Sequence, residues 1–175
     1  MSIAYLLSGS NLGDRAANLQ SAMSLIREHA GKITVCSPVY ESPSWGFEHP
    51  VPFLNQAIKI ETSLSAESLL STLHQIEKKC GRKRSGGGYE ARTLDIDILF
   101  YDDIIIDTAD LSIPHPRLQL RRFALLPVSV IAPGLQHPVL GKSISELLHE
   151  CPDDSIVTEF KVGDPYQEKE ASDAI

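Results

Sequence analysis

The spacing of apolar residues predicts alternating strands and helices over the first 101 residues. Short apolar or alternating runs are typical of strands, whereas apolar residues three or four positions apart are typical of helices. The predicted strands are residues 2–8, 33–40, 53–61 and 94–101, and the predicted helices are residues 12–30 and 66–80. We expect Asn11 and Ser65 to cap these helices at their N-terminal ends, and Gly31 and Gly81 to end them.

The later part of the chain is predicted to add to this core. Residues 42–52 contain three prolines and should form an irregular loop, residues 102–111 a hairpin, and residues 117–131 a helix that Pro127 interrupts. The order strand, helix, strand, strand, helix, strand predicts an α+β sandwich, with helices packed on a mostly antiparallel sheet. We expect a single domain over residues 1–160 and a frayed polar tail over residues 161–175.

Composition and charge indicate a soluble cytoplasmic protein. The chain has 175 residues, 42% of them hydrophobic, which is enough for a core and excludes intrinsic disorder. A formal net charge of −7 argues against a general binder of nucleic acids or anionic membranes. No apolar run approaches the roughly 20 residues of a membrane span, and the N-terminus has no signal-peptide pattern. Three widely spaced cysteines fit a reducing cytoplasm.

Two aspartates stand out in the predicted strand at residues 94–101. Alternation divides this strand between Leu94, Ile96, Ile98 and Phe100 on a core face and Asp95 and Asp97 on the opposite face. Aspartate is rare in strands, and like charges on one face repel each other. The pair is therefore either the wet face of an amphipathic strand or a site for Mg²⁺ ions that neutralise nucleotide phosphates.

A basic, glycine-rich segment directly precedes this strand. Residues 81–92 contain four Lys or Arg residues and one Glu, so this segment is positive in an otherwise acidic chain. Arginine side chains present planar donor groups to phosphate oxygens, and glycines allow a loop to move. The segment could also be a solvated surface turn. Its position next to two carboxylates favours a binding site for a polyphosphate with Mg²⁺.

Two further clusters could complete such a site. Prolines on both sides of His115 restrict its backbone, and Arg121 follows six residues later, where it could contact a phosphate. A lone histidine is more often structural than catalytic. The second cluster combines aromatic and turn residues at 40–46 with Phe53 and Asn55, which share one strand face. Phe53 could simply be part of the core, but an aromatic face with an amide also suits a flat, polar heterocycle.

Seven motifs in order resemble the 6-hydroxymethyl-7,8-dihydropterin pyrophosphokinase family of folate biosynthesis. The resemblance extends from Ala4 to about Leu148. The motifs are Gly9-Ser10-Asn11-Leu12-Gly13-Asp14-Arg15, Tyr40-Glu41-Ser42-Pro43, Phe53-Leu54-Asn55, Gly81-Arg82 with Arg84, Arg92-Thr93-Leu94-Asp95-Ile96-Asp97, Ile113-Pro114-His115-Pro116-Arg117, and Arg121 with Phe123. The chain differs from the family mainly at Tyr89-Glu90-Ala91-Arg92, where Trp-Gly-Pro-Arg is usual. The resemblance implies a ferredoxin-like α+β fold.

The resemblance also implies the roles of individual residues. Asp95 and Asp97 would bind two Mg²⁺ ions and, with Arg82 and Arg92, form the catalytic group. The residues implied to bind ATP are His74, Glu77, Arg82, Arg84, Tyr89, Arg92, Ile98, His115 and Arg121. The residues implied to bind the reduced pterin are Ser42, Pro43, Phe53, Asn55, Asp95 and Phe123, with the two phenylalanines on either side of the ring.

The implied reaction transfers diphosphate from ATP to the hydroxymethyl group of the pterin and releases AMP. Two other classes remain open. A regulatory domain of the same architecture could bind a small molecule without turnover, but the paired aspartates and the arginine-rich loop would then be unexplained. A Mg²⁺-dependent nuclease or nucleotidyltransferase would be at odds with the acidic net charge. We expect a monomer with one activity and no nucleic-acid or membrane partner.

Overall fold

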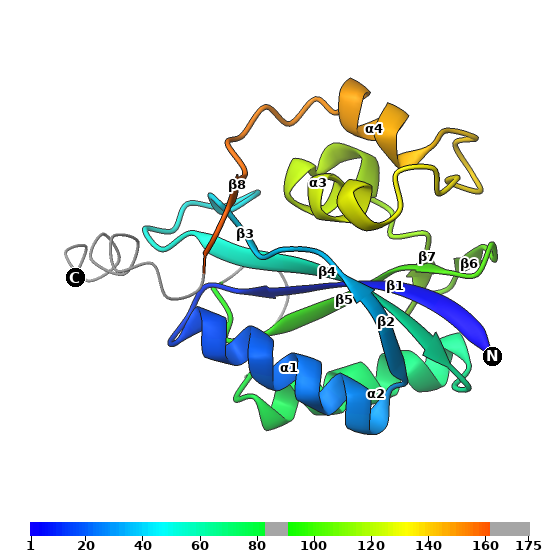
Figure 1. Cartoon of the computed structure of the whole chain (residues 1–175), viewed down its shortest axis with the longest axis horizontal. Helices are drawn as coiled ribbons and strands as arrows, with labels where there is room; N and C mark the ends of the chain where they lie inside the picture. The colour runs from blue at the N-terminus through cyan, green and yellow to red at the C-terminus, as the bar shows by residue number, and fades with distance from the viewer. Residues whose placement is uncertain (83–90, 162–175) are drawn as a thin grey trace.

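The computed structural model describes residues 1–82 and 91–161 and is built around a six-stranded antiparallel sheet (Figure 1). The strands are β1 (Ser2–Ser10), β2 (Lys32–Cys36), β3 (Tyr40–Ser42), β4 (Phe53–Thr62), β5 (Asp95–Tyr101) and β8 (Thr158–Glu159). Their order is β5-β1-β4-β3-β8, and β2 also pairs with β4. Strands β6 (Ile106–Asp107) and β7 (Ser112–Ile113) form a separate small hairpin.

Helices cover both faces of the sheet. Helices α1 (Arg15–His29) and α2 (Ala66–Lys79) lie on one face, and α3 (Arg122–Ile131) and α4 (Ile144–Glu150) lie on the other (Figure 1). On α2, the residues Leu69, Leu73 and Ile76 recur at helical spacing and are fully buried against the sheet. The second face has its own core, to which Leu125 and Val128 of α3 contribute.

The predicted fold class is confirmed. The elements β1, α1, β2 with β3, β4, α2 and β5 follow the expected order, and all paired strands run antiparallel. The predicted strand over residues 33–40 is divided into β2 and β3, because Ser37 and Pro38 interrupt the pairing with β4. The Ser37 hydroxyl accepts a hydrogen bond from the backbone N–H of Ala57, which bridges this gap.

Three local predictions were wrong in detail. Asp14, not Asn11, caps α1, since its carboxylate accepts a hydrogen bond from Ala17 N at 2.9 Å. Phe100 does not share the face of Ile96 and Ile98. A bulge in the pairing of β5 with β1 shifts the register there, so Phe100 packs in the core beneath α3. The hairpin is formed by β6 and β7, displaced toward residue 113 from the expected range.

The segment after residue 116 also differs from the prediction. A short 3₁₀ helix (Leu118–Leu120) precedes α3, which begins at Arg122 and continues through Pro127 instead of breaking there. The sequence reading did not identify α4 or β8. Ser65 does cap α2, and Gly81 adopts a left-handed conformation (φ +84°) at its end, as expected. No helix in the described residues is long and apolar enough to cross a membrane.

Candidate active site

Strand β5 carries Asp95 and Asp97 into the centre of the site. Their partners on β1 are Gly9 and Leu7, so the two carboxylates leave the sheet on one face, as alternation predicted. Both side chains line two neighbouring cavities. The face that carries the two aspartates thus opens into these cavities and not onto a flat surface, which favours the binding-site interpretation of the pair.

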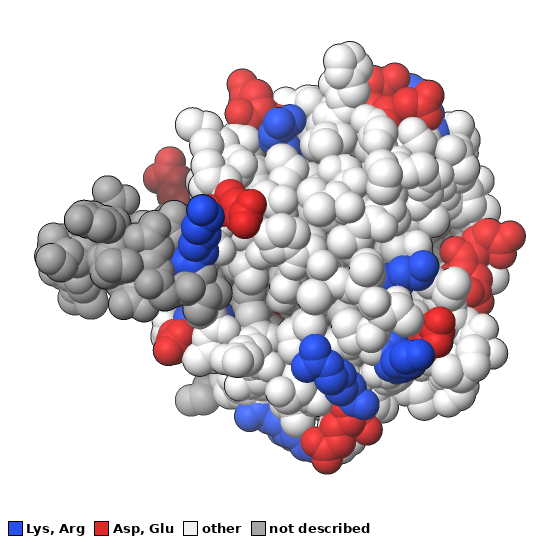
Figure 2. Space-filling view, in the orientation of Figure 1, with Lys and Arg blue, Asp and Glu red and all other residues white. Residues whose placement is uncertain are grey.

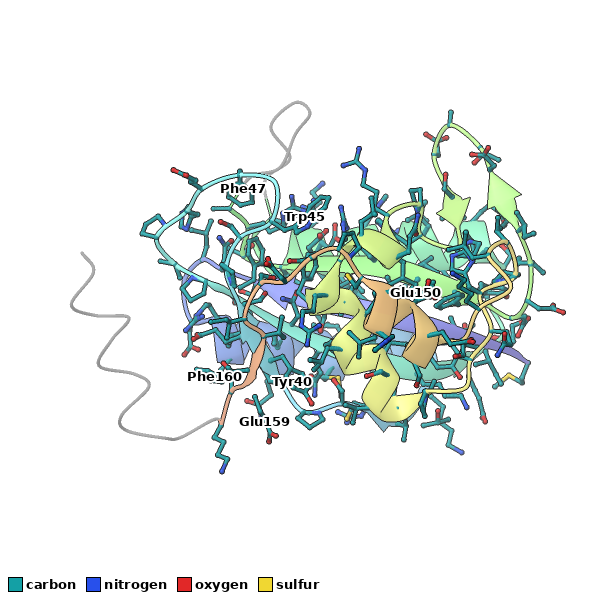
Figure 3. The ribbon with its side chains drawn as sticks, turned by 90° about the horizontal axis from the view of Figure 1, so that it is seen from above. Tyr40, Trp45, Phe47, Glu150, Glu159 and Phe160 are labelled. Atoms are coloured by element: carbon teal, nitrogen blue, oxygen red, sulfur yellow. The ribbon has the colours of Figure 1, made fainter. Side chains whose placement is uncertain are left out.

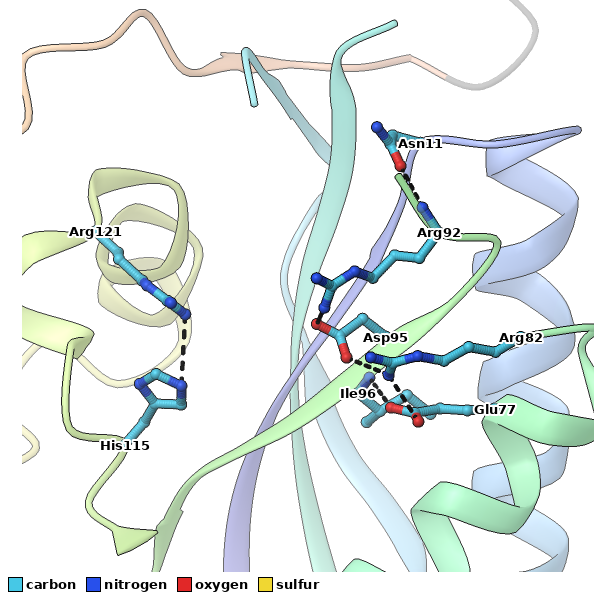
Figure 4. Close-up of polar contacts among 8 residues, drawn as sticks. All are labelled: Asn11, Glu77, Arg82, Arg92, Asp95, Ile96, His115 and Arg121. Atoms are coloured by element: carbon cyan, nitrogen blue, oxygen red, sulfur yellow. Dashed lines mark hydrogen bonds and ion pairs between the residues drawn. The ribbon is translucent and has the colours of Figure 1, made fainter. Parts of the chain in front are cut away.

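Asp95 lies between two arginines (Figure 4). Arg82 Nη1 is 2.5 Å from Asp95 Oδ1, and Arg92 Nη1 is 2.7 Å from Asp95 Oδ2. Burial raises the pKa of Asp95, but the charges of Arg92 and Arg82 and their hydrogen bonds outweigh burial and hold this pKa below its ordinary value. Asp95 is therefore ionised at neutral pH, and it holds both arginines at the mouth of the site.

Glu77 connects this cluster to the fold. Its carboxylate is buried, 2.7 Å from Arg82 Nη1, and it accepts a hydrogen bond from the backbone N–H of Ile96 at 2.8 Å (Figure 4). Helix α2 and strand β5 are thus joined through one side chain. Glu77 also lines the second cavity described below, and its predicted contact with ATP stays a prediction.

Asp97 is in a different electrostatic state. Burial raises its pKa to about 7, and the negative charge of Asp95 adds to the shift, against the opposing effects of Arg121 and Arg92. The pKa values of the two aspartates differ because Arg82 and Arg92 pair closely with Asp95. Asp97 therefore takes up a proton at a higher pH than Asp95 does.

His115 and Arg121 face these carboxylates from the other side of the site. Arg121 Nη1 is 3.4 Å from His115 Nε2 (Figure 4), and the His115 backbone N–H donates to Leu99 O at 3.0 Å. Burial, followed by the positive charge of Arg121, lowers the pKa of His115 to about 4. His115 is thus a neutral imidazole at pH 7, held next to a cation that could bind a phosphate.

The first cavity has aromatic walls and a volume of about 140 Å³. All six predicted pterin-binding residues line it: Ser42, Pro43, Phe53, Asn55, Asp95 and Phe123. Asn55 is buried, and its amide donates to Ser42 Oγ at 3.3 Å. A Cβ atom on Gly9 would lie 2.7 Å from Asn55 Oδ1, so only glycine leaves room there for the amide.

The second cavity, of about 350 Å³, has a more polar lining. His74, Glu77, Arg82 and Ile98 line it, as predicted, together with residues of the segment from 109 to 112. The two cavities share the same four charged or titratable side chains: Arg92, Asp95, Asp97 and His115. Two small molecules, one bound in each cavity, would therefore lie next to each other at Asp95 and Asp97.

Comparison with known proteins agrees with this geometry. Residues 5–133, more than half of the chain, match the model of the 7,8-dihydro-6-hydroxymethylpterin-pyrophosphokinase family. The chain belongs to this pyrophosphokinase family. It is 39% identical over 141 residues to the 2-amino-4-hydroxy-6-hydroxymethyldihydropteridine pyrophosphokinase of Porphyromonas gingivalis, covering 79% of this chain and 95% of that protein. Identity to the Bacillus subtilis protein of the same name is 42% over 130 residues, covering 74% and 77%.

Solved structures show the same fold. A Plasmodium falciparum HPPK-DHPS triple mutant superposes with a TM-score of 0.71 at 20% sequence identity, over 85% of this chain and 44% of that one. The pyrophosphokinase chain thus spans less than half of that solved protein, and at this identity the likeness establishes the fold alone.

One aromatic residue of the site, Phe47, was not predicted from the sequence, whereas Trp45 belongs to the aromatic cluster expected at residues 40–46. Trp45 and Phe47, on the loop after β3, line the aromatic cavity (Figure 3). The Trp45 and Phe123 ring centroids are 6.5 Å apart, and the Arg121 guanidinium lies 4.8 Å from the Trp45 centroid. Position in a proline-rich loop next to the pterin motif was the available signal for Phe47. Arg84 and Tyr89, predicted to bind ATP, lie outside the described residues, as does most of the predicted tail.

Asn11 also gained a role that its sequence position did not indicate. Its side-chain oxygen accepts from the backbone N–H of Arg92 at 2.7 Å, and its own backbone N–H donates to Arg92 O at 3.0 Å (Figure 4). These two bonds join the end of β1 to the segment that leads into β5. Asn11 therefore fixes the backbone of Arg92, whose side chain pairs with Asp95, instead of capping a helix.

Proposed function

We propose that this chain transfers a diphosphate group from ATP to the hydroxymethyl oxygen of 6-hydroxymethyl-7,8-dihydropterin and releases AMP, with Mg²⁺ as cofactor. One observation carries the proposal: an aromatic cavity and a polar cavity meet at Asp95 and Asp97. Membership of the pyrophosphokinase family and the names of the relatives support the same reaction.

The aromatic cavity suits the pterin. Phe53 and Phe123 supply apolar surfaces for a flat ring, and the Asn55 amide supplies a donor and an acceptor for its polar edge. Because Asn55 is held between Ser42 and Gly9, its amide is already oriented before a ligand arrives. A pterin in this position would direct its hydroxymethyl group toward the aspartates shared with the second cavity.

The polar cavity suits the nucleotide. Arg82 and Arg92 line this cavity and present guanidinium groups at the aspartates. Arg121, which lines the aromatic cavity, adds a third from the facing side. Since nothing in the cavity resembles a phosphate-binding loop of the GxxxxGK[ST] type, the phosphates would depend on these side chains and on metal ions. His74 and Ile98 would then lie along the nucleoside.

The carboxylates fit Mg²⁺. Hard divalent cations prefer oxygen ligands, and Mg²⁺ commonly takes one or two carboxylates together with substrate phosphates and water. No group of three or more metal-ligating side chains occurs in residues 1–82 and 91–161, which matches a site completed by substrate. Bound Mg²⁺ would be held by Asp95 and Asp97 and would neutralise charge on the phosphates. Binding would leave both carboxylates ionised.

In the proposed reaction, the hydroxymethyl oxygen forms a bond to the β-phosphorus while the bond from that phosphorus to the AMP oxygen breaks. The hydroxyl proton is lost to solvent. Arg82 and Arg92 stabilise the charge that develops on the transferred group, and the aromatic walls hold the hydroxymethyl group in line. Positioning and electrostatics of this kind account for most of the rate enhancement in related phosphoryl transfers.

Product analysis tests this function. The purified protein is incubated with ATP, Mg²⁺ and 6-hydroxymethyl-7,8-dihydropterin, with each component omitted in turn, and nucleotides are separated by chromatography. AMP that forms only in the complete mixture supports diphosphate transfer. ADP would indicate transfer of a single phosphate, and absence of any product with binding of pterin alone would favour a regulatory binding protein.

Lys and Arg side chains on the face in Figure 2 are interspersed with Asp and Glu, without a continuous basic surface for a nucleic acid.

The two cavities should respond separately to substitution. Phe123→Ala is expected to raise the KM for the pterin by about 10- to 100-fold, the usual effect of removing an aromatic ring from a stacked heterocycle, and to leave the KM for ATP within about twofold. His74→Ala should show the reverse selectivity, with a smaller change because a polar contact is lost. Steady-state kinetics with each substrate varied in turn would measure both. Equal increases in the KM values for pterin and ATP in Phe123→Ala would contradict the assignment of one cavity to each substrate.

Mg²⁺ binding should strengthen as pH rises through 7. The pKa of Asp97 is about 7 without a metal, so below this pH Mg²⁺ must displace a proton, and above it the site is already ionised. We expect the Mg²⁺ affinity of the ATP-bound protein to increase about tenfold from pH 6 to pH 8, measured by calorimetry with a non-hydrolysable ATP analogue. Free ATP is the control, because its own titration contributes in the same range. A protein-dependent affinity that does not change with pH would contradict the assignment.

A further inference from the structure

The loop over residues 43–52 forms one wall of the aromatic cavity. Pro43, Trp45 and Phe47 all line the cavity from this loop, which leaves β3 after Ser42 and enters β4 at Phe53. Inside the loop, the Phe47 ring packs edge-on against Phe53, with centroids 6.1 Å apart. The position of these aromatic rings therefore depends on how the two ends of the loop are held.

One arginine contacts both ends of this loop. Arg15, the first residue of α1, has its Nη1 atom 2.7 Å from Glu41 Oε2 and 2.9 Å from Pro52 O. Glu41 precedes the loop by two residues, and Pro52 is its last residue. The Arg15 side chain is only 10% exposed and that of Glu41 is 32% exposed, so these bonds are partly protected from water.

A C-terminal segment covers the same arginine. Phe160 follows β8, which pairs with β3 at Tyr40 and Glu41, and its ring centroid is 5.5 Å from the Arg15 guanidinium carbon. Its backbone N–H donates to Val39 O at 2.8 Å. In Figure 3 Phe160 lies beside Tyr40 of β3. This segment lies beyond residues 5–133, which match the family model, yet it packs on the support of the loop.

Arg15 is not among the residues that line the two cavities. Its interactions lie behind the loop instead. The stacked ring of Phe160 restricts the guanidinium, and the restricted guanidinium restricts Glu41 and Pro52. Order in the loop is thus established before a ligand binds, which lowers the entropy cost of closing aromatic residues on the ligand.

We propose that Arg15 is a positioning residue for pterin recognition: it joins the two ends of the 43–52 loop and so sets Trp45 and Phe47 in the wall of the aromatic cavity. The inference rests on the proposed function for the identity of the ligand. We call the contacts of the Arg15 guanidinium with Glu41, Pro52 and Phe160 the clamp. These contacts are present in the protein without ligand.

The test compares Arg15→Met with Arg27→Met, which removes an exposed arginine from the same helix. Trp45 is the only tryptophan of the chain, so its fluorescence reports on the loop. We expect Arg15→Met to increase acrylamide quenching of Trp45 about twofold, and to weaken pterin binding about tenfold in calorimetry, as the loss of charge-assisted hydrogen bonds suggests. ATP affinity should stay within twofold. Arg27→Met should resemble the wild type in every measurement.

Two further variants separate positioning from general stability. Arg15→Lys keeps a cation near Glu41 but lacks the planar guanidinium that lies over the Phe160 ring, and should restore part of the pterin affinity. Glu41→Gln removes the ion pair from the other side and should weaken pterin binding in the same direction, even if Arg15→Met folds poorly. Parallel loss of pterin affinity, ATP affinity and melting temperature in these variants would overturn the proposal, as would unchanged pterin affinity in Arg15→Met.

The outcomes also distinguish this inference from the proposed reaction. If the wild type binds the pterin but forms no AMP, the reaction is wrong while the quenching and affinity measurements still test the clamp. If the wild type forms AMP and Arg15→Met has an unchanged KM for the pterin, the reaction stands and the clamp is wrong. If the wild type does not bind the pterin at all, this inference fails together with the assignment of the cavity.

Discussion

Asp97→Asn is expected to abolish diphosphate transfer and, at the same time, to raise the melting temperature of the ligand-free protein at pH 8. Activity should fall by at least about a thousandfold, because the variant lacks a carboxylate for Mg²⁺ at the point where the two cavities meet. Stability should rise because the substitution removes a charge that the folded protein holds at a cost. Asp97 destabilises its own fold because its carboxylate is buried and, second, because Asp95 lies on the same face of β5.

The pH dependence of this stability effect follows from the pKa of Asp97. Folding raises this pKa from the ordinary 3.8 to about 7, so the folded state favours the protonated form. The stabilisation from that protonation is complete below the unfolded-state pKa and is lost as pH rises through 7. At pH 8 the wild type therefore lacks it, and Asp97→Asn should be more stable by a few kcal/mol, or roughly 5 °C or more in melting temperature. At pH 5 most of the difference should disappear.

Thermal unfolding at pH 5 and pH 8 without metal, followed by an AMP assay, would measure both effects. Asp103→Asn, an exposed aspartate in the turn after β5, is the matched control and should change neither. Asp97→Asn with a melting temperature at or below that of the wild type at pH 8 would show that Asp97 is not held at an electrostatic cost. Normal turnover by this variant would exclude Asp97 from the metal site.

Glu77→Ala is expected to have the largest effect on stability. Its carboxylate is buried, pairs with Arg82 and accepts from Ile96 N, so its removal leaves a partly buried guanidinium and a buried N–H without this partner. Breaking a buried ion pair from one side typically costs about 3–5 kcal/mol. We expect a loss of that order in urea unfolding, together with reduced activity, since Arg82 is no longer oriented toward Asp95.

Two variants provide the controls for Glu77. Glu77→Gln keeps an acceptor for Ile96 N and should lose about half as much stability as Glu77→Ala, because only the charge interaction is removed. Gln75→Ala changes an exposed residue two positions earlier on α2 and should be neutral within about 0.5 kcal/mol. A loss below 1 kcal/mol in Glu77→Ala would mean that Arg82 and β5 are held by other contacts.

The parts of the fold that depend on local pattern were predictable from the sequence. The stripe Leu69, Leu73 and Ile76 with its cap at Ser65 determines α2, and the predicted α+β class followed from the order of such elements. The face of Phe100 was not predictable, because a bulge arises from the register between β5 and β1, which local alternation does not contain. Strand β8 has only two residues and exists through its pairing with β3.

The candidate site also has parts that the sequence could predict and parts that it could not. Asp95 and Asp97 could be identified because charged residues in an apolar strand conflict with its local preference. The separate roles of Asp95, paired with two arginines, and Asp97, with its raised pKa, depend on side chains from distant segments and required the three-dimensional arrangement. Arg15 illustrates the same limit: its sequence position at the start of a helix does not show that it contacts Glu41 and Pro52 across the fold.

The most direct test of the account is a crystal structure of the protein with the pterin, a non-hydrolysable ATP analogue and Mn²⁺ in place of Mg²⁺, with the metal located by anomalous scattering. We predict Mn²⁺ at Asp95 and Asp97, the pterin between Phe53 and Phe123, and the phosphates against Arg82 and Arg92, with the hydroxymethyl oxygen facing the β-phosphorus. Mn²⁺ bound away from both aspartates, or a nucleotide that occupies the aromatic cavity, would contradict the account.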